Sequence, residues 1–242
     1  TTTQINIEVV GDDENESTES FWISYSNGVN VQIPEPFNTI TIENDDYNYN
    51  PSDSGFTTPL SYPGFNLVWA DEFDSTALNT DDWNYETGNS GWGNEESQFY
   101  RSGDHNARVQ DGYLIITAKR EGFSGAPFTS ARITTQNNQS FQYGRIDIRA
   151  RLPYGQGLWP ALWMLGDNFS TAGWPSCGEL DIMELIGGDG YNDRTVHGTA
   201  HWAGTSGAQA SHTGAKSLPS GKYADQFHVF SVVWDQSTIR WY

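Results

Sequence analysis

The chain has 242 residues, of which 31 are acidic and 12 basic, so its formal net charge at pH 7 is -19. This charge argues against nucleic acid, anionic membranes and polyanionic substrates as partners, because phosphate and sulfate groups are held by Lys and Arg; a neutral polymer remains compatible. Aromatic residues make up 14% of the chain, including ten Trp and twelve Tyr, which suits contact with flat apolar faces such as sugar rings as well as a β-sheet core.

The single cysteine, Cys177, excludes an intrachain disulfide. No stretch of the sequence is long and apolar enough to span a membrane as a helix. The chain begins at Thr1 with neither an initiator Met nor a secretory signal, and it closes at Tyr242 on the strand-like run STIRWY. We therefore expect a piece of a longer protein, cut at both ends.

Residues 1–46 alternate polar and apolar side chains in the runs INIEVV, SFWISYS and NTITIENDD, which predicts strands joined by polar turns. The segment resembles the C-terminal half of a Calx-beta module, so we expect a partial β module here. Its turns hold five acids that offer oxygen ligands for calcium, although a solvated acidic turn is the simpler interpretation: Asp12, Asp13, Glu14, Asp45 and Asp46. Residues 47–61 are rich in Asn, Ser, Pro and Gly and are interpreted as a linker.

From residue 62 to residue 242, short strand-like runs alternate with Gly, Asn and Ser turns, and no helical period is sustained. The dipeptide Asp111-Gly112 is a strong hairpin signal. The pattern predicts an all-β domain, a sandwich or jelly roll of two antiparallel sheets. In chain order the predicted strands are FNLVWADEF, GYLIITAKR, ARITTQ, YGRIDIRARL, LWPALWML, ELDIMELI, TVHGTAHW and FHVFSVVWD.

The run ELDIME places three carboxylates, Glu179, Asp181 and Glu184, in a segment that is otherwise apolar. In a strand, residues i and i+2 share a face, so Glu179 and Asp181 point together. Strict alternation would turn Glu184 to the apolar face. A β-bulge at Ile182–Met183 would return it to the acidic face.

Three chemical interpretations of this strand are open. The acids could simply face water on a half-exposed strand. They could cleave a glycosidic bond, because two carboxylates that flank the bond act as acid and as nucleophile or base; separations of about 5–5.5 Å give retention and about 6.5–9.5 Å inversion. They could also hold a hard metal ion, although such sites usually recruit loop carbonyls, which a strand commits to its ladder.

At these residues the chain resembles glycoside hydrolase family 16, in its laminarinase-like branch with the pattern Glu-x-Asp-x-x-Glu. The resemblance rests on WPSCGELDIME, on GWGNEESQFY and GLWPALWML upstream, and on HGTAHW downstream. It implies a β-jelly-roll sandwich of the concanavalin A-like type over residues 62–242, with C-terminal strands beyond the present chain. It also implies retaining, endo-acting hydrolysis of β-1,3-glucosidic bonds in laminarin-type β-glucans.

The resemblance also implies a role for each matching residue. Glu179 corresponds to the nucleophile, Glu184 to the general acid/base and Asp181 to the assisting carboxylate between them. The implied substrate-binding residues are Asn94, Glu95, Arg132, Trp159, Trp174 and His201. Trp163 in the same motif is interpreted as a core residue, His197 as structural, and Cys177 as a packing residue.

The resemblance further implies a β-glucan partner, no cofactor for catalysis, and secretion or display at the surface of a bacterial cell. The family's structural calcium is not assigned to any residue here. Two alternatives remain within the same fold: a non-catalytic β-glucan-binding module, and a family member that acts on mixed-linkage glucan or marine galactan. A third is that residues 1–46 are the working part of an adhesive protein. The presence of both glutamates favours the enzyme.

Overall fold

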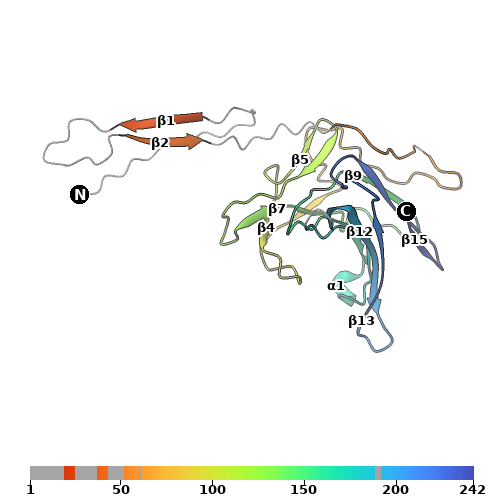
Figure 1. Ribbon diagram of the computed structural model, residues 1–242. Coiled ribbons are helices and arrows are strands. Elements are labelled where there is room, and N and C mark those ends of the chain that lie inside the picture. The colour runs from red at the N-terminus through yellow and green to blue at the C-terminus, as the bar shows by residue number, and fades with distance from the viewer. Residues whose placement is uncertain (1–18, 25–36, 43–51, 60, 189–191) are drawn as a thin grey trace. The chain divides into compact units, whose positions relative to one another are not determined.

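The structure is a computed structural model that describes residues 19–24, 37–42, 52–59, 61–188 and 192–242 (Figure 1). The chain divides into two units, Thr1–Pro51 and Ser52–Tyr242. In the first unit, β1 (Glu19–Ser24) and β2 (Phe37–Ile42) pair antiparallel. These strands lie in two of the three predicted runs. The run INIEVV and the five acids of the turns lie outside the described residues.

The second unit is built on two antiparallel sheets that face each other. One sheet has the order β10-β11-β12-β13 and the other has the order β15-β14-β9. The strands of the first sheet are β10 (Ala161–Leu165), β11 (Glu179–Glu184), β12 (Thr195–Ala203) and β13 (Gln209–Ser217). Those of the second sheet are β9 (Gly144–Ala150), β14 (His228–Trp234) and β15 (Ile239–Trp241).

The hydrophobic core lies between these two sheets. Apolar side chains of β11 pack against Phe230 and Val232 of β14, with Leu152, Val196 and Tyr223 completing the cluster. The period of two along each strand sends these side chains inward and their neighbours outward. Burial of each large aliphatic side chain stabilises the fold by about 1.5–3 kcal/mol. The predicted all-β sandwich is confirmed.

Three further strand pairs flank the sandwich among the described residues of this unit. The pair β5–β6 turns at Asp111 and Gly112, whose φ angles are 53° and 80°. Positive φ at both central residues is the geometry of a type I′ turn, so the predicted hairpin is confirmed. The pairs are β3 (Asn84–Glu86) with β8 (Arg132–Thr134), β4 (Gln98–Tyr100) with β7 (Phe128–Ser130), and β5 (Ala107–Gln110) with β6 (Tyr113–Ile116).

Helical structure is confined to two short turns in the described part of the chain, α1 (Phe169–Ala172) and the 3-10 turn η1 (Asn192–Arg194). None of the helices there has the length and apolarity needed to cross a membrane.

The structure differs from the sequence prediction at two longer segments, besides the short strands β3, β4 and β7, which were not predicted. The run FNLVWADEF forms no strand, and Leu67 and Val68 are 78% and 81% exposed. Alternation yields a strand only where a partner completes the hydrogen-bond ladder, and the described residues supply none for this run. Conversely, β13 was not predicted, because its polar and small residues carry no apolar alternation. It forms because it pairs with β12 over its whole length, from Gln209↔Ala203 to Ser217↔Thr195.

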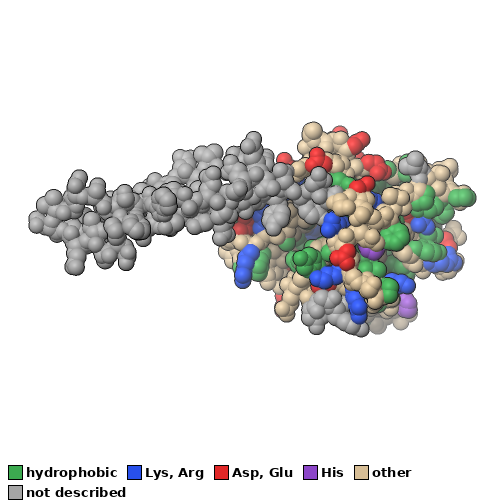
Figure 2. Space-filling model, turned by 45° about the horizontal axis from the view of Figure 1, so that its top comes forward, with side chains coloured by type: hydrophobic (Ala, Val, Ile, Leu, Met, Phe, Trp, Pro, Cys, Tyr) green, Lys and Arg blue, Asp and Glu red, His purple; other side chains and the backbone are tan. Residues whose placement is uncertain are grey.

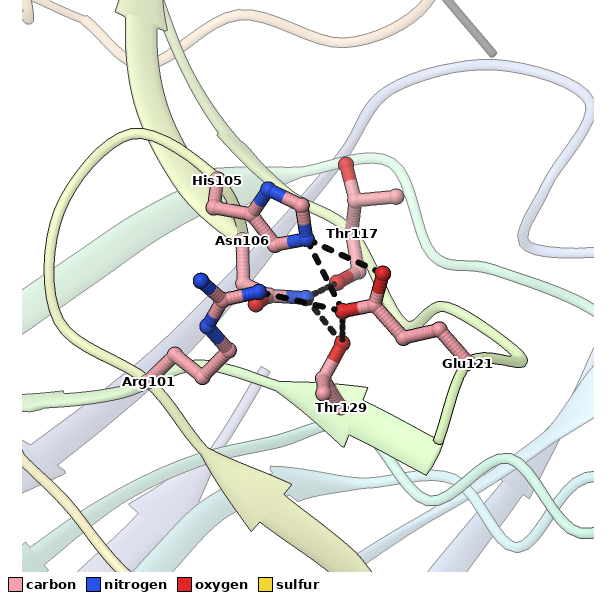
Figure 3. A network of polar contacts seen from close by, with 6 residues as sticks. All are labelled: Arg101, His105, Asn106, Thr117, Glu121 and Thr129. Carbon is pink, nitrogen blue, oxygen red and sulfur yellow. Dashed lines mark hydrogen bonds and ion pairs between the residues drawn. The ribbon is translucent and has the colours of Figure 1, made fainter. Parts of the chain in front are cut away.

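A polar network centred on Glu121 fixes the loop between β4 and β5 (Figure 3). The Glu121 carboxylate accepts hydrogen bonds from Arg101 at 3.3 Å, from His105 at 2.8 Å and from the Thr129 hydroxyl. Buried Asn106 donates to the Thr129 hydroxyl at 3.0 Å and to the Thr117 carbonyl. Because Thr129 belongs to β7, the network ties this loop to the parallel pair β4–β7.

Candidate active site

The pairing of β11 with β12 decides where the three acids point. Residues directly opposite each other in an antiparallel pair share a face. The partners of the acids on β12 lie two residues apart from one another, so they also share a face. The acids therefore project from the same side of the sheet. The matched pairs are Glu179↔His201, Asp181↔Thr199 and Glu184↔His197.

A β-bulge makes this arrangement possible. Between the matched pairs at Asp181 and Glu184, Ile182 and Met183 of β11 stand opposite the single residue Gly198 of β12. Ile182 and Met183 both turn into the core, where they are 5% and 0% exposed. The predicted bulge at Ile182–Met183 is confirmed, and Glu184 joins the acidic face.

Asp181 is the most deeply buried of the three acids, at 3% exposure. Nε2 of His201 lies 3.2 Å from Oδ2 of Asp181 and 3.9 Å from Oε1 of Glu179. Gln209 contacts the other ring nitrogen of His201, with 3.0 Å between Nε2 of Gln209 and Nδ1 of His201. This ring therefore sits between the first two acids and is held by the neighbouring strand.

Burial raises the pKa of Asp181 to about 8, and the charges of Glu184 and Glu179 and a hydrogen bond with Glu179 add to the effect. This shift is caused mainly by burial, with smaller contributions from the two neighbouring acids. It places a proton on the middle carboxyl at neutral pH. A neutral carboxyl between two other acids gives the site the unequal protonation that acid–base chemistry uses.

Two exposed tryptophans border the acids. Trp159, which is 47% exposed, donates from its indole nitrogen to Oε1 of Glu184 over 3.0 Å. Trp174 is 45% exposed, and its ring centre lies 6.1 Å from that of His201. Both rings offer a flat apolar surface beside polar side chains of the site, which is the combination that suits a pyranose ring.

Arg132 joins the site through a stack of rings. Its guanidinium lies 4.8 Å from the ring centre of Trp92 and 4.7 Å from that of Trp163, and it forms an ion pair with Glu86. Trp163 pairs directly with Asp181 and so lies on the acidic face. The prediction that Trp163 is a core residue is wrong. Its neighbours in β10, Leu162 and Met164, pack on the core and turn it outward.

His197, for which we predicted a structural role, also shares the acidic face, opposite Glu184. The alternation of TVHGTAHW carried the signal for it, because His197 and His201 are four residues apart and so lie on the same face of a regular strand.

Asn94 and Glu95 are both exposed, and Glu95 has a φ of 56°. Glu96, which was not predicted as a site residue, organises this segment. Its carboxylate accepts hydrogen bonds from Tyr100 at 2.5 Å, from Gln98 at 2.7 Å and from Asn94 at 3.3 Å. Burial and the bond to Glu96 raise the pKa of the Tyr100 phenol. The second Glu of NEES was the only sequence signal for it.

This segment reaches Arg132 through the side chains of Tyr100 and Trp92. The ring centres of Trp92 and Tyr100 are 5.5 Å apart in an edge-to-face arrangement, and the Arg132 guanidinium stacks on the Trp92 ring. The aromatic pair therefore links Asn94 and Glu96 to the acidic face by way of Arg132 and Trp163.

Three ligand atoms in the site are close enough for a metal ion. One atom each from Glu179, Asp181 and His201 lie within 4.8 Å of one another. A metal would have to displace the proton of Asp181, because a carboxylate ligates in its ionised form.

Comparison with known proteins identifies close relatives of this unit. A beta-glucanase from Rhodothermus marinus is 43% identical over 185 residues, which are 74% of this chain and 63% of that protein. A glucan endo-1,3-beta-glucosidase A1 from Niallia circulans is 40% identical over 204 residues, 78% of this chain and 30% of that protein. The chain thus spans less than two thirds of the length of these relatives.

Among solved structures, the laminarinase catalytic domain of Thermotoga maritima MSB8 superposes with a TM-score of 0.66 at 44% identity, covering 73% of each chain. Residues 94–242 match the sequence profile of "Glycosyl hydrolases family 16". This match includes β11 with its three acids and every strand of the two sheets. The chain belongs to glycosyl hydrolase family 16.

Proposed function

We propose that this chain carries out retaining, endo-acting hydrolysis of β-1,3-glucosidic bonds in laminarin-type β-glucans. The observation that carries the proposal is the bulged register of β11, which gathers Glu179, Asp181 and Glu184 on one face. The relatives named above as a beta-glucanase, a glucan endo-1,3-beta-glucosidase and a laminarinase support the choice of substrate.

The reaction proceeds by two displacements at the anomeric carbon. Glu184 protonates the glycosidic oxygen while Glu179 attacks the anomeric carbon, which breaks the bond to the leaving sugar and forms a glycosyl ester. Glu184 then takes a proton from water, and the water oxygen replaces Glu179. The neutral carboxyl of Asp181 hydrogen-bonds to Glu179 and disperses its charge without adding a negative charge of its own to the site.

The flanking residues bind the glucan. Trp159 and Trp174 stack on pyranose rings on either side of the acids, and the indole of Trp159 also orients Glu184. The His201 ring lies beside Glu179 and Asp181 and orients their carboxyl groups. Arg132, Asn94 and Glu95 contact sugars on the donor side, where Arg132 is fixed between two rings.

Neither a cofactor nor a metal takes part in this mechanism, since both proton transfers use carboxyl groups of the chain. A calcium ion with a structural role is compatible with it. We also propose that the protein acts outside a bacterial cell or at its surface, because a polysaccharide must be cut into shorter pieces before a cell can take it up.

The experiment that tests the proposal compares Glu179→Gln with the wild type on laminarin. The variant keeps the shape of the side chain but lacks the nucleophile, so release of reducing sugar should fall by a factor of roughly 10³ or more, while laminarin binding is retained. Glu72→Gln, a change at an exposed glutamate, is the matched control and should leave the rate unchanged. The wild-type rate should survive treatment with EDTA.

Two further outcomes decide between this proposal and its alternatives. Proton NMR of the first product should show the β anomer; early appearance of the α anomer would mean inversion and would remove Glu179 as nucleophile. Laminarin binding by the wild type without release of reducing sugar would favour a binding module. Higher initial rates on lichenan, agarose or carrageenan than on laminarin would reassign the substrate.

A further inference from the structure

The side of β11 opposite the acids has an unusual contact. The indole nitrogen of Trp241, on β15 of the facing sheet, donates a hydrogen bond to the backbone carbonyl of Asp181 over 2.8 Å. Asp181 is the last residue of β11 that is matched with β12 before the bulge. A side chain from the other sheet therefore contacts the backbone of the catalytic strand at the residue where its register changes.

The residue opposite the bulge makes room for this indole. A Cβ atom on Gly198 would lie 2.4 Å from Cδ1 and 2.6 Å from Nε1 of Trp241, well inside van der Waals contact. The indole thus occupies the space that a side chain on β12 would fill, next to Ile182 and Met183. Because Gly198 has no side chain, the indole of Trp241 packs against the backbone on the core side of the bulge.

We propose that Trp241 is a positioning residue for the carboxylates of β11, acting through its hydrogen bond to the Asp181 carbonyl over Gly198. This inference deepens the proposed function and rests on it. Trp241 lies on the core side of the sheet, whereas the substrate is bound on the acidic side, so it acts through the strand and not by touching the glucan.

The physical reason is that the bulge gives β11 one residue more than β12, which leaves its peptide groups with fewer constraints than a regular ladder provides. The directions of Asp181 and Glu184 depend on the peptide planes between them. A charge-free donor fixed in the opposite sheet holds the first of these planes. Without it the plane can rotate, and small displacements of catalytic groups are costly: about 1 Å can lower a rate by as much as 10²-fold.

The test removes the indole N–H while keeping an aromatic ring at position 241. Trp241→Phe is the first variant. The second replaces Trp241 with benzothienylalanine, which has the shape of tryptophan and carries sulfur in place of the N–H. We expect kcat on laminarin to fall about tenfold or more in both, with KM changed less than about twofold, because ground-state binding uses the other face.

The matched control is Trp202→Phe, which removes an exposed indole from β12, the strand that pairs with β11. It should leave kcat unchanged. A kcat within about twofold of wild type in the benzothienylalanine variant would overturn the proposal, since only the hydrogen bond is missing there. A loss in Trp241→Phe alone would assign the residue to packing and would likewise overturn it.

A readout independent of activity separates this inference from the proposed function. Loss of the donor should move the ¹³C resonance of the Asp181 carbonyl upfield in both Trp241 variants and leave it in place in Trp202→Phe. If the wild type hydrolyses no β-glucan, the proposed function fails. In that case the ¹³C shift of the Asp181 carbonyl still tests the hydrogen bond from Trp241. A resonance that does not move in the Trp241 variants contradicts this hydrogen bond.

Discussion

Asp181 has the most unusual environment of any single carboxyl group in the site. It is 3% exposed, it lies between two other acids on the same strand, and the His201 ring lies 3.2 Å from its Oδ2. A carboxylate in such a place is destabilised by lost hydration and by its neighbours' charges. The resulting preference for the neutral form makes the stability of the fold depend on pH.

The direction of this pH dependence follows from the pKa of Asp181 in the folded and in the unfolded chain. The pKa of Asp181 rises from an ordinary value of 3.8 to about 8 in the folded chain. Between these pH values the folded state keeps a proton that the unfolded state releases, so the free energy of unfolding falls as the pH rises. The slope for one such group is at most about 1.4 kcal/mol per pH unit.

We therefore expect Asp181→Asn, which is neutral at every pH, to gain stability relative to the wild type as the pH increases from about 4 to about 8. Urea unfolding of both proteins across this range measures the difference. Asp167→Asn, at an exposed position, should follow the wild type. Parallel curves for the wild type and Asp181→Asn would show that the carboxyl titrates normally.

The sequence predicted the position of Asp181 on the acidic face correctly, but it failed for some of the residues around it. The pattern Glu-x-Asp-x-x-Glu was enough to place three acids together, because a strand has only two faces. The prediction for Trp163 is wrong because its position in β10, between Leu162 and Met164 of the core, decides its face, whereas its size and aromatic character do not. Glu96 was missed because the fold alone brings Tyr100 and Gln98 to its carboxylate.

Among the elements, the loop between β4 and β5 depends on a single carboxylate. Burial raises the pKa of Glu121, but the hydrogen bonds from Thr129 and His105 outweigh it and hold the pKa below the ordinary 4.5. The contribution to stability is thus present above that pH and lost as the pH falls below it. The carboxylate also satisfies donors that would otherwise be left without a partner.

Glu121→Gln should lower the free energy of unfolding at pH 7 by about 1–3 kcal/mol, because an amide cannot accept from all three donors. The difference in unfolding free energy between the variant and the wild type should shrink at acidic pH, where the wild-type carboxylate is protonated. Thermal unfolding at pH 7 and at acidic pH measures both effects. Glu72→Gln is the control, and an equal loss there would rule out a role for the network.

The strands show where sequence patterns succeed at this scale. Apolar alternation predicted β9, β11, β12 and β14, and the hairpin at Asp111-Gly112 followed from its need for positive φ. β13 was missed because a polar strand is defined by its partner. The run FNLVWADEF has the alternation but lacks a partner among the described residues. Which strands pair is decided by the whole fold, and the apolar alternation within one strand carries no information on its partner.

The whole chain combines two units of different charge. Residues 1–51 hold ten of the 31 acidic side chains and none of the 12 basic ones. On the face of the second unit that Figure 2 shows, Asp and Glu side chains are interspersed with Lys, Arg and apolar ones. The net charge of the chain therefore overstates the acidity of the unit that carries the site. The prediction that residues 1–46 form a partial Calx-beta module remains a prediction.

Because the division falls after Pro51, we expect a chain of residues 52–242 to show the proposed hydrolysis of laminarin at the same rate as the longer chain. Its midpoint of thermal unfolding should stay within about 2 °C of that of the longer chain, equivalent to less than roughly 1 kcal/mol at this size. Calorimetry and a reducing-sugar assay on both chains provide the measurement. A larger fall in the midpoint would mean that the first unit stabilises the second.

The indole of Trp241 in the space above Gly198 also restricts how this sequence can change over time. A larger residue at 198 is incompatible with tryptophan at 241, whereas a smaller residue at 241 leaves a void that only a side chain at 198 can fill. Either substitution alone is deleterious, and the two together restore the volume. In an alignment of homologous chains, these two positions, far apart in sequence, should therefore covary.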